Sequence, residues 1–386
     1  MPDVHIYGGG MAGLSAAFLL EQHKKPYHLY ETLSHWGGKL QTTVQDGFAL
    51  DHGFQVIQSA YPALSMYHER GYLKDALAFG SGAWLLSHQG KTLLADPLRE
   101  FPRGLAALGH PSISFKDVLQ VVKLRNALIK QSPSAFFDQS STTTYHYLQQ
   151  CGFSQSFIEA FFKPFFTGIF LEEALNTPSA MFQFVFWALA KGKAMLMPGG
   201  IQTLPNRIVA DLNPNHIHLN HPENPTIRVP APKQYFSTQA LYFAVDSDLG
   251  LGKFIGLNAT NTGCINLMAI PSAVQKGYAP KGKHLLCISL KPGIGATDIV
   301  PSPTAVLGEA ETLLGTRIAG EWLNTMTVNK ALPADTPYRY GDGQMHLEGG
   351  DTNKDVDFHA SGCIANPSLN AAILHGTSFV SAIICR

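Results

Sequence analysis

Three glycines near the start of the chain have the type and spacing of a phosphate-binding turn. Gly8, Gly10 and Gly13 lie between the apolar run Val4–Tyr7 and a stretch from Ala12 to His23 with apolar residues at helical spacing. In a strand-turn-helix unit, such glycines make the tight turn, let the backbone approach a pyrophosphate, and pack the helix against the strand. The N–H groups at the helix N-terminus favour an anion. This spacing therefore predicts that the chain binds a dinucleotide.

A second strand and an acidic residue complete the predicted βαβ unit. Lys24-Lys25-Pro26 ends the helix, Tyr27–Tyr30 has the length and apolar content of a strand, and Glu31 follows it. A carboxylate about 20 residues beyond the glycines accepts a hydrogen bond from a ribose hydroxyl and disfavours the 2′-phosphate of NADP. With the two residues that open the helix, the predicted site comprises Gly8, Gly10, Met11, Ala12, Gly13 and Glu31.

The next segment supplies a second glycine pair. In "TLSHWGGKLQT", Gly37 and Gly38 are followed by the cationic Lys39. A second loop rich in N–H groups suits a cofactor with more to hold than one pyrophosphate face. An ordinary loop with a solvated lysine is the alternative.

These motifs resemble the FAD-binding start of the amine oxidase, protoporphyrinogen oxidase and phytoene desaturase superfamily. Four later blocks are similar to that superfamily in the same order, and the D-x-G-F-Q pattern in the first of them indicates its desaturase-like branch. The blocks are "GFALDHGFQVI" (47–57), "FFKPFFTGIFLEEAL" (161–175), "MPGGIQTLPNRIVADL" (197–212) and "SGCIANPSLNAAILHGTSFVSAI" (361–383). The resemblance implies FAD as cofactor and adds to the site Gly37, Gly38, Lys39, Gly53, Phe54, Gln55, Gly362, Cys363, Leu369, Asn370 and Ala371.

The resemblance also implies an α/β fold with a discontinuous, Rossmann-like FAD-binding domain. We expect that domain at residues 1–60, 195–235 and 348–386, and an interleaved helix-plus-sheet substrate domain at 61–194 and 236–347. The first part of the substrate domain is expected to be largely helical, with a serine-capped helix over Ser114–Lys130. The short apolar runs of its second part, separated by Gly and Pro, indicate a sheet. A further helix is expected over Ile201–Leu212.

The implied chemistry depends on the flavin more than on side chains. Flavin enzymes of this type take a hydride from a substrate C–H bond, and the isoalloxazine performs that step. The helix after Pro367-Ser368 is expected to aim its first N–H groups at the flavin edge that becomes negative. We identify no catalytic side chain and no metal-binding pattern, and we interpret Lys291 as a surface residue rather than a flavin-facing lysine.

A cluster of aromatic residues could indicate the kind of substrate that the protein binds. It could form an ordinary helical core, or it could line a tunnel for a lipophile such as a polyene or isoprenoid. Both interpretations stay open at this stage. The cluster comprises Phe157, Phe161, Phe162, Phe165, Phe166, Phe170, Phe182, Phe184, Phe186 and Trp187.

Two departures from the superfamily pattern leave another function open. Cys363 stands where the family has an aspartate that accepts hydrogen bonds from the ribityl chain, and a thiol is a weak acceptor. The segment from His216 to Gln239 is also shorter than the family's. An FAD-dependent oxidoreductase acting on a lipophilic substrate is therefore the first expectation. A flavin-poor lipid- or protein-binding member of the same fold, or a flavin amine oxidase, is the alternative.

The amino-acid composition restricts the classes of partner and the cellular location that we expect. The chain has 386 residues, 45% of them hydrophobic, and 28 basic residues balance 28 acidic ones, so no basic field indicates nucleic acid. No secretion signal or apolar run of about 20 residues stands out. The five cysteines are scattered, which indicates reduced thiols. We expect a cytoplasmic protein, compatible with peripheral membrane contact, of undetermined oligomeric state.

Overall fold

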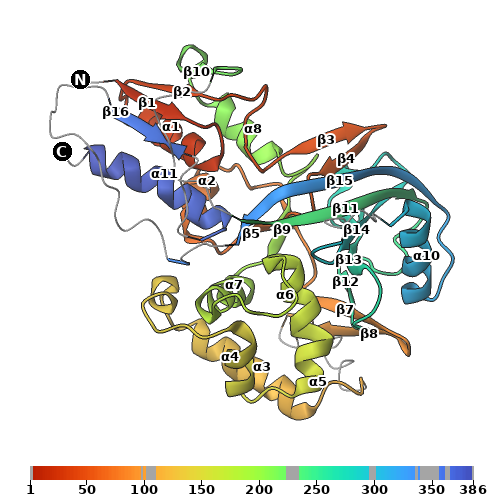
Figure 1. Cartoon of the computed structure of the whole chain (residues 1–386). Helices are drawn as coiled ribbons and strands as arrows, with labels where there is room; N and C mark the ends of the chain where they lie inside the picture. The colour runs from red at the N-terminus through yellow and green to blue at the C-terminus, as the bar shows by residue number, and fades with distance from the viewer. Residues whose placement is uncertain are drawn as a thin grey trace.

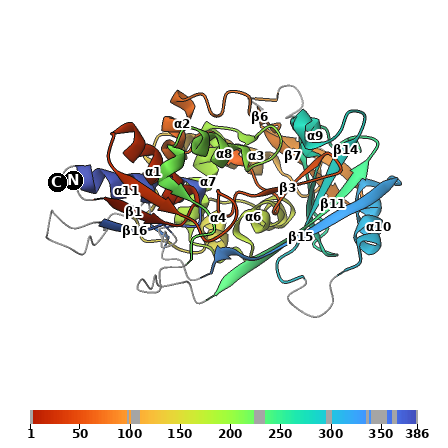
Figure 2. The same ribbon diagram turned by 90° about the horizontal axis from the view of Figure 1, so that it is seen from above.

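The computed structural model describes residues 3–96, 99–100, 110–222, 234–294, 301–334, 338–339, 356–360 and 366–384. A small parallel sheet with its helices lies at one end of the molecule, and a large mixed sheet lies at the other (Figure 1). A group of helices lies beside both sheets. The view from above also shows the small sheet at one end, the large sheet at the other and helices between them (Figure 2). The mixture of parallel and antiparallel sheets with helices confirms the expected α/β class.

The small sheet is the predicted βαβ unit, extended on both sides. Its strands are all parallel, in the order β10-β2-β1-β16. They span Ile217–His218 (β10), Tyr27–Tyr30 (β2), Val4–Tyr7 (β1) and Val356–His359 (β16). Strands β1 and β2 begin and end where the sequence predicts them. The outer two come from distant parts of the chain, so the sheet is assembled from three separate segments.

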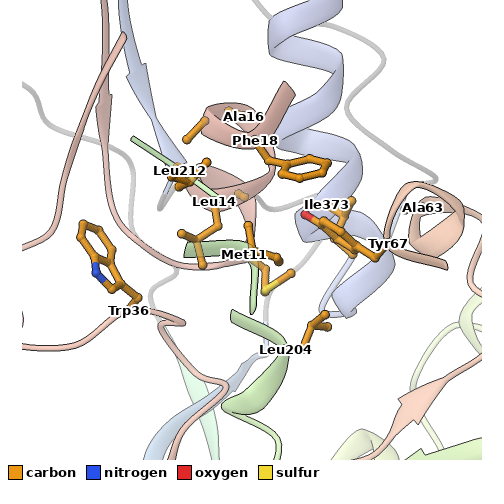
Figure 3. Packing of buried hydrophobic residues seen from close by; sticks show 14 of the residues in the cluster. Met11, Leu14, Ala16, Phe18, Trp36, Ala63, Tyr67, Leu204, Leu212 and Ile373 are labelled. Carbon is orange, nitrogen blue, oxygen red and sulfur yellow. The ribbon is translucent and has the colours of Figure 1, made fainter. Parts of the chain in front are cut away.

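Helices α1 (Met11–Gln22) and α11 (Leu369–Ile384) pack against each other beside this sheet. Their contact depends on Gly376, because a Cβ at that position would lie 2.0 Å from the carbonyl oxygen of Ala12. The close approach brings Ile373 into a core with Met11 and other apolar side chains of α1 (Figure 3). The C-terminal helix is thereby held next to the glycine turn.

Residues just beyond position 60 also belong to this core. The 3₁₀ turn η1 (Pro62–Leu64) and helix α2 (Ser65–Glu69) bring Tyr67 against α1, where its hydroxyl lies 2.7 Å from Ser15 Oγ. Figure 3 shows Ala63 and Tyr67 beside Ile373. The division into domains remains our proposal, and this packing favours placing the first boundary near Ala78, the last of these residues against the core.

The other face of the small sheet carries rings instead of aliphatic side chains. Half-buried histidines and tyrosines alternate with the buried residues of β1 and β2, and they stack on each other and on His218 and His359 of the outer strands. The ring centroids of Tyr7 and His359 are 5.0 Å apart, and those of Tyr30 and His218 are also 5.0 Å apart. This face therefore continues as an aromatic layer to the ends of β1 and β2.

The large sheet has seven strands in the order β15-β11-β14-β13-β12-β7-β8. The expected sheet in the second part of the substrate region is present, and strands β11 and β15 are its longest members. The bounds are β7 Gly82–Ser87, β8 Gly90–Ala95, β11 Tyr235–Val245, β12 Ile255–Asn258, β13 Ile265–Ala269, β14 His284–Leu290 and β15 Gly320–Pro333.

Residues 61–194 are largely helical, as expected, and strands β7 and β8 are the main exception. Their runs "GAWLLS" and "GKTLLA" contain Leu and Ala, which are compatible with a helix. The parallel pairing of β7 with β12, for example Trp84 with Gly256, places these residues in the large sheet instead. A partner more than 150 residues away overrides the local preference.

The helices of this region form a layer beside the large sheet (Figure 1). Helix α3 (Phe115–Leu128) is the serine-capped helix that the sequence predicts. Ser114 and Asp117 form a capping box, in which each side chain accepts from the other's backbone N–H. The rest of the layer comprises α4 (Thr144–Gln150), α5 (Gln155–Phe157), a π-helical turn (Ile158–Phe162), α6 (Lys163–Phe170) and α7 (Ser179–Lys191).

Shorter elements connect these layers. A hairpin of β3 (Thr42–Gln45) and β4 (Phe48–Asp51) turns at Asp46-Gly47, where both residues have positive φ as a two-residue hairpin requires. Helix α8 (Thr203–Ala210) lies within the expected 201–212 helix. The remaining elements are β5 Ile57–Gln58, β6 Leu77–Ala78, β9 Ala194–Leu196, η3 Pro133–Phe136, η5 Pro214–His216, α9 Pro271–Val274, η6 Lys276–Tyr278 and α10 Pro303–Leu314.

Candidate functional site

One cavity of about 1150 Å³ extends from the glycine turn into the helical layer. Its wall includes the start of α1, the ends of β1 and β2, the first turn of α11, and apolar faces of α3, α6 and α7. Ligand cavities for one drug-sized molecule measure roughly 300–1,000 Å³, so this cavity has room for more than one such ligand. The predicted nucleotide site and the predicted aromatic cluster thus meet in one space.

The three glycines have separate structural tasks. Gly8 has a φ of +107°, which only glycine adopts without strain, and it makes the turn after β1. A Cβ on Gly13 would lie 2.0 Å from the Gly8 carbonyl oxygen, so this glycine lets α1 pack against the turn. A Cβ on Gly10 would meet only the Cα of Gly38, at 3.9 Å, so the space beside Gly10 is open. Gly8, Gly10, Met11 and Ala12 line the cavity, and Gly13 supports it from behind.

Glu31 lies in the cavity wall at the end of β2 and is 7% exposed. Its Oε2 accepts a hydrogen bond from the Gly9 N–H at 2.7 Å. Its Oε1 accepts from the Leu33 N–H at 2.9 Å and from Thr32 Oγ1 at 3.1 Å. Strand β10 supports the same residue, because the Glu31 N–H donates to the His218 carbonyl. The carboxylate therefore holds the glycine turn as well as facing the cavity.

The second glycine pair lies against the first glycine turn. The Gly37 N–H donates to the Gly9 carbonyl at 2.8 Å, and both Gly37 and Gly38 line the cavity. Lys39 also lines it, and burial lowers the pKa of its ammonium group. Its Nζ donates to the Ala331 carbonyl on β15 at 2.8 Å, which ties the loop to the large sheet.

The D-x-G-F-Q segment connects the two parts of the protein. Phe54 and Gln55 line the cavity, whereas Gly53 contributes its carbonyl to a contact with the hydroxyl of Tyr242 at 3.3 Å. Asp51 is buried and accepts hydrogen bonds from Thr42, Ile201 and Tyr278. Burial raises the pKa of Asp51 to about 6, despite these hydrogen bonds. Gly53 is thus a supporting residue rather than a wall residue.

Helix α11 begins at the cavity, as expected, but its first residues divide their tasks. Leu369 lines the cavity together with Ser368. Asn370 is fully buried outside it, and its Oδ1 accepts from the Ala63 N–H at 3.1 Å. The Ala371 N–H is capped by Ser368 Oγ at 3.1 Å. Asn370 and Ala371 do not line the cavity, so their contact with the cofactor stays a prediction, and Gly362 and Cys363 lie outside the described residues.

The residues of the aromatic cluster divide between the helical core and the cavity wall. Phe162, Phe182 and Phe184 have no exposed surface and form the core of the helical layer. Phe161, Phe165, Phe166, Phe157 and Phe186 line the cavity. The π-helical turn Ile158–Phe162 ends two residues before Pro164, which has no N–H for a regular α-helical hydrogen bond.

Several residues of the cavity wall were not predicted from the sequence. Tyr7, Tyr30 and His359 line the nucleotide end, and burial lowers the pKa of His359. Gln58 is 7% exposed, and its Oε1 is buried without a hydrogen-bond partner among the described residues. Arg125 lies at the helical end. Alternation along β1 and β2 could have indicated the two tyrosines, but nothing local distinguishes Gln58 or Arg125.

The wall fits a flavin dinucleotide. The space at Gly10 admits a pyrophosphate close to the backbone, and Glu31 is placed for a ribose hydroxyl. The unpaired Gln58 oxygen is an acceptor for an N–H group, which a flavin ring carries. The cavity also extends beyond this region into an apolar space.

Comparison with known proteins agrees with this arrangement. The model of the family described as flavin containing amine oxidoreductase matches residues 11–224. The chain belongs to this family. It is an FAD-dependent oxidoreductase of the amine oxidase superfamily.

Three solved structures show the shared fold. A provisionally assigned protoporphyrinogen oxidase from Exiguobacterium sp. 255-15 is 16% identical, with a TM-score of 0.65, covering 100% of this chain and 99% of that one. Putrescine oxidase bound to putrescine is 14% identical, with a TM-score of 0.63 and the same two coverages. Reduced UDP-galactopyranose mutase is 13% identical, with a TM-score of 0.57, covering 86% and 83%.

Comparison with curated protein sequences yields no match. Within the described residues, no helix is both long enough and apolar enough to cross a membrane. The three cysteines described, Cys151, Cys264 and Cys287, are free thiols. Lys291 does not line the cavity, and its Nζ donates to the Thr262 carbonyl at 3.2 Å.

Proposed function

We propose that this oxidoreductase removes a hydride from a lipophilic substrate, in the manner of a desaturase or oxidase. The observation that carries the proposal is the continuity of the cavity. The same space is lined by the glycine turn at one end and by Phe161, Phe165 and Val121 at the other. The helical end of the wall is mainly apolar and aromatic, which favours a hydrophobic ligand there.

The chain's own residues would bind, orient and shield the reactants. FAD supplies the hydride acceptor when it is bound. Gly8, Gly10 and Glu31 would hold its nucleotide part, and Gln58 would accept from a donor on its ring. The phenylalanines would orient the substrate and exclude water. Peripheral contact with a membrane, where such a substrate resides, belongs to the same proposal.

A small diamine fits the cavity less well. Putrescine oxidase is a structural neighbour that binds putrescine, and a diamine needs acidic partners. The described wall has two carboxylates, Glu31 and Asp96. The first accepts from three donors at the glycine turn, where the FAD ribose would take its remaining acceptor position, and the second lies within 4.0 Å of both Arg99 and Arg125. These positions favour a lipophile over a dication.

A flavin-poor binding protein is the other alternative, and retention of flavin distinguishes it. The purified protein should be yellow and should release FAD on denaturation. Protein without flavin, even after incubation with excess FAD, would contradict the proposed reaction.

The substrate class is tested by anaerobic reduction of the bound flavin. An acyclic isoprenoid polyene in detergent should remove the visible absorption of the oxidised flavin, and putrescine should not. Phe161→Gln should slow the reduction because it places an amide in the apolar wall. Phe115→Gln is the matched control, since Phe115 is 65% exposed on the outside of α3. Reduction by putrescine alone would refute the proposed substrate class.

A further inference from the structure

Arg125 is a basic group at the apolar end of the cavity. It lies in the last turn of α3, one turn after Val121 and Val122, which line the same wall. Its Nε atom is buried and makes no hydrogen bond within the described part of the chain. The nearest counter-charge, Asp96 Oδ2, is 4.0 Å from that atom, beyond hydrogen-bonding distance. A buried guanidinium N–H without a partner is costly, and the Arg125 side chain lines the cavity, so this position favours a ligand that brings an acidic group to the guanidinium.

The neighbouring arginine has a different role. Arg99 donates to the carbonyls of Leu189 and Gly192 at 3.1 and 2.7 Å, and also to that of Ala190. It thereby satisfies the carbonyl groups at the C-terminus of α7. Arg99 is a structural residue of the wall, whereas the Nε–H of Arg125 has no hydrogen-bond partner within the described ranges.

The charge of the wall points in the same direction. Five basic side chains line the described cavity against two carboxylates. The basic residues are Lys39, Arg99, Arg125, Lys193 and Lys330. A dinucleotide pyrophosphate would place its two negative charges at the glycine end of the cavity. It would not neutralise the positive charge of Arg125 at the other end. An apolar wall that ends at a guanidinium whose Nε–H has no hydrogen-bond partner among the described residues suits a hydrophobic molecule with an acidic end.

We propose that the substrate is a lipophile carrying a carboxylate or similar acidic group, and that Arg125 binds this group. The proposal rests on the proposed function, because it assigns a polar end to the same apolar substrate. Asp96 competes for the guanidinium at 4.0 Å when no acid is bound. Arg125 would determine specificity and the direction in which the substrate enters, and it would take no part in hydride transfer.

The test compares two probes that share one hydrocarbon chain. Oleic acid and oleyl alcohol are titrated into the flavin-loaded enzyme, and binding is followed by calorimetry and by perturbation of the flavin spectrum. The acid should bind at least about tenfold more tightly, the factor expected for a hydrogen bond to a charged group. Arg125→Gln should remove this ratio, and Arg125→Lys should retain part of it.

Two further variants separate specificity from stability. Lys123→Gln removes an exposed charge from the same helix and should leave the ratio unchanged. Asp96→Asn removes the competing carboxylate and should increase the ratio. This second variant keeps the proposal testable even where Arg125→Gln fails to fold.

The outcomes distinguish this inference from the function on which it rests. Equal binding of acid and alcohol to the unmodified enzyme, or an unchanged ratio in Arg125→Gln, would overturn the role of Arg125 and leave a lipophilic substrate standing. Failure of both probes to bind the flavin-loaded enzyme would overturn the lipophilic cavity itself.

Discussion

Replacing Glu31 with glutamine should weaken both the folded protein and its hold on FAD. The carboxylate accepts three hydrogen bonds, from the N–H groups of Gly9 and Leu33 and from the hydroxyl of Thr32. Glutamine has one acceptor oxygen, and its NH₂ group would face at least one backbone N–H. The substitution therefore leaves a buried donor unpaired beside the glycine turn.

The magnitude follows from those contacts. A hydrogen bond to a charged group contributes about 1.5–3 kcal/mol, and Glu31 is 7% exposed, so little of this is lost to solvent. We expect the free energy of unfolding of the apoprotein to fall by about 2 kcal/mol for one lost bond. The dissociation constant for FAD should rise about tenfold or more, because the ribose contact is weakened too.

Urea unfolding of the apoprotein measures the first effect, and titration of the apoprotein with FAD measures the second. Glu309→Gln is the matched control. Glu309 on α10 also accepts from two backbone N–H groups, those of Cys264 and Ile265, both at 2.9 Å, and it does not line the cavity. It should lose stability to a similar extent and keep its affinity for FAD.

Two results would refute this reasoning. Unchanged FAD affinity in Glu31→Gln would mean that the carboxylate makes no cofactor contact. Equal loss of FAD affinity in Glu31→Gln and Glu309→Gln would mean that affinity follows general stability and not the glycine turn.

Three further predictions concern the same region. Gly13→Ala should abolish FAD binding in a titration, because its Cβ would lie 2.0 Å from the Gly8 carbonyl, whereas Gly308→Ala in α10 meets nothing within 4 Å and should raise thermal stability. Lys39→Ala should weaken FAD less than Glu31→Gln in the same titration, since backbone amides would still hold the phosphates; a larger loss would show that Lys39 binds them directly. The pKa of Asp51 is raised from 3.8 to about 6, so its stabilising contribution is complete below the lower value and lost as pH rises through the higher one. Unfolding measured across that range should show a decline of up to about 3 kcal/mol that Asp51→Asn abolishes.

Local patterns in the sequence determined the glycine turn and the elements around it. Strand β1, helix α1 and strand β2 could be predicted because their signals lie within thirty residues: alternation, helical spacing and three glycines. The cap of α3 was equally local, since Ser114 and Asp117 satisfy N–H groups of their own helix turn. Motif resemblance extended the prediction to FAD and to the family.

Only the tertiary structure decided which side chains form the cavity. Strands β7 and β8 are strands because β12 pairs with β7 from far along the chain. Phe161 lines the cavity while its neighbour Phe162 is buried, although both are phenylalanines in one helical run. The Nε–H of Arg125 has no hydrogen-bond partner among the described residues because Asp96, which follows β8, lies 4.0 Å away. Strand pairing, burial and side-chain contacts of this kind depend on segments that are distant in the sequence. Local periodicity does not reveal which distant segments pack together.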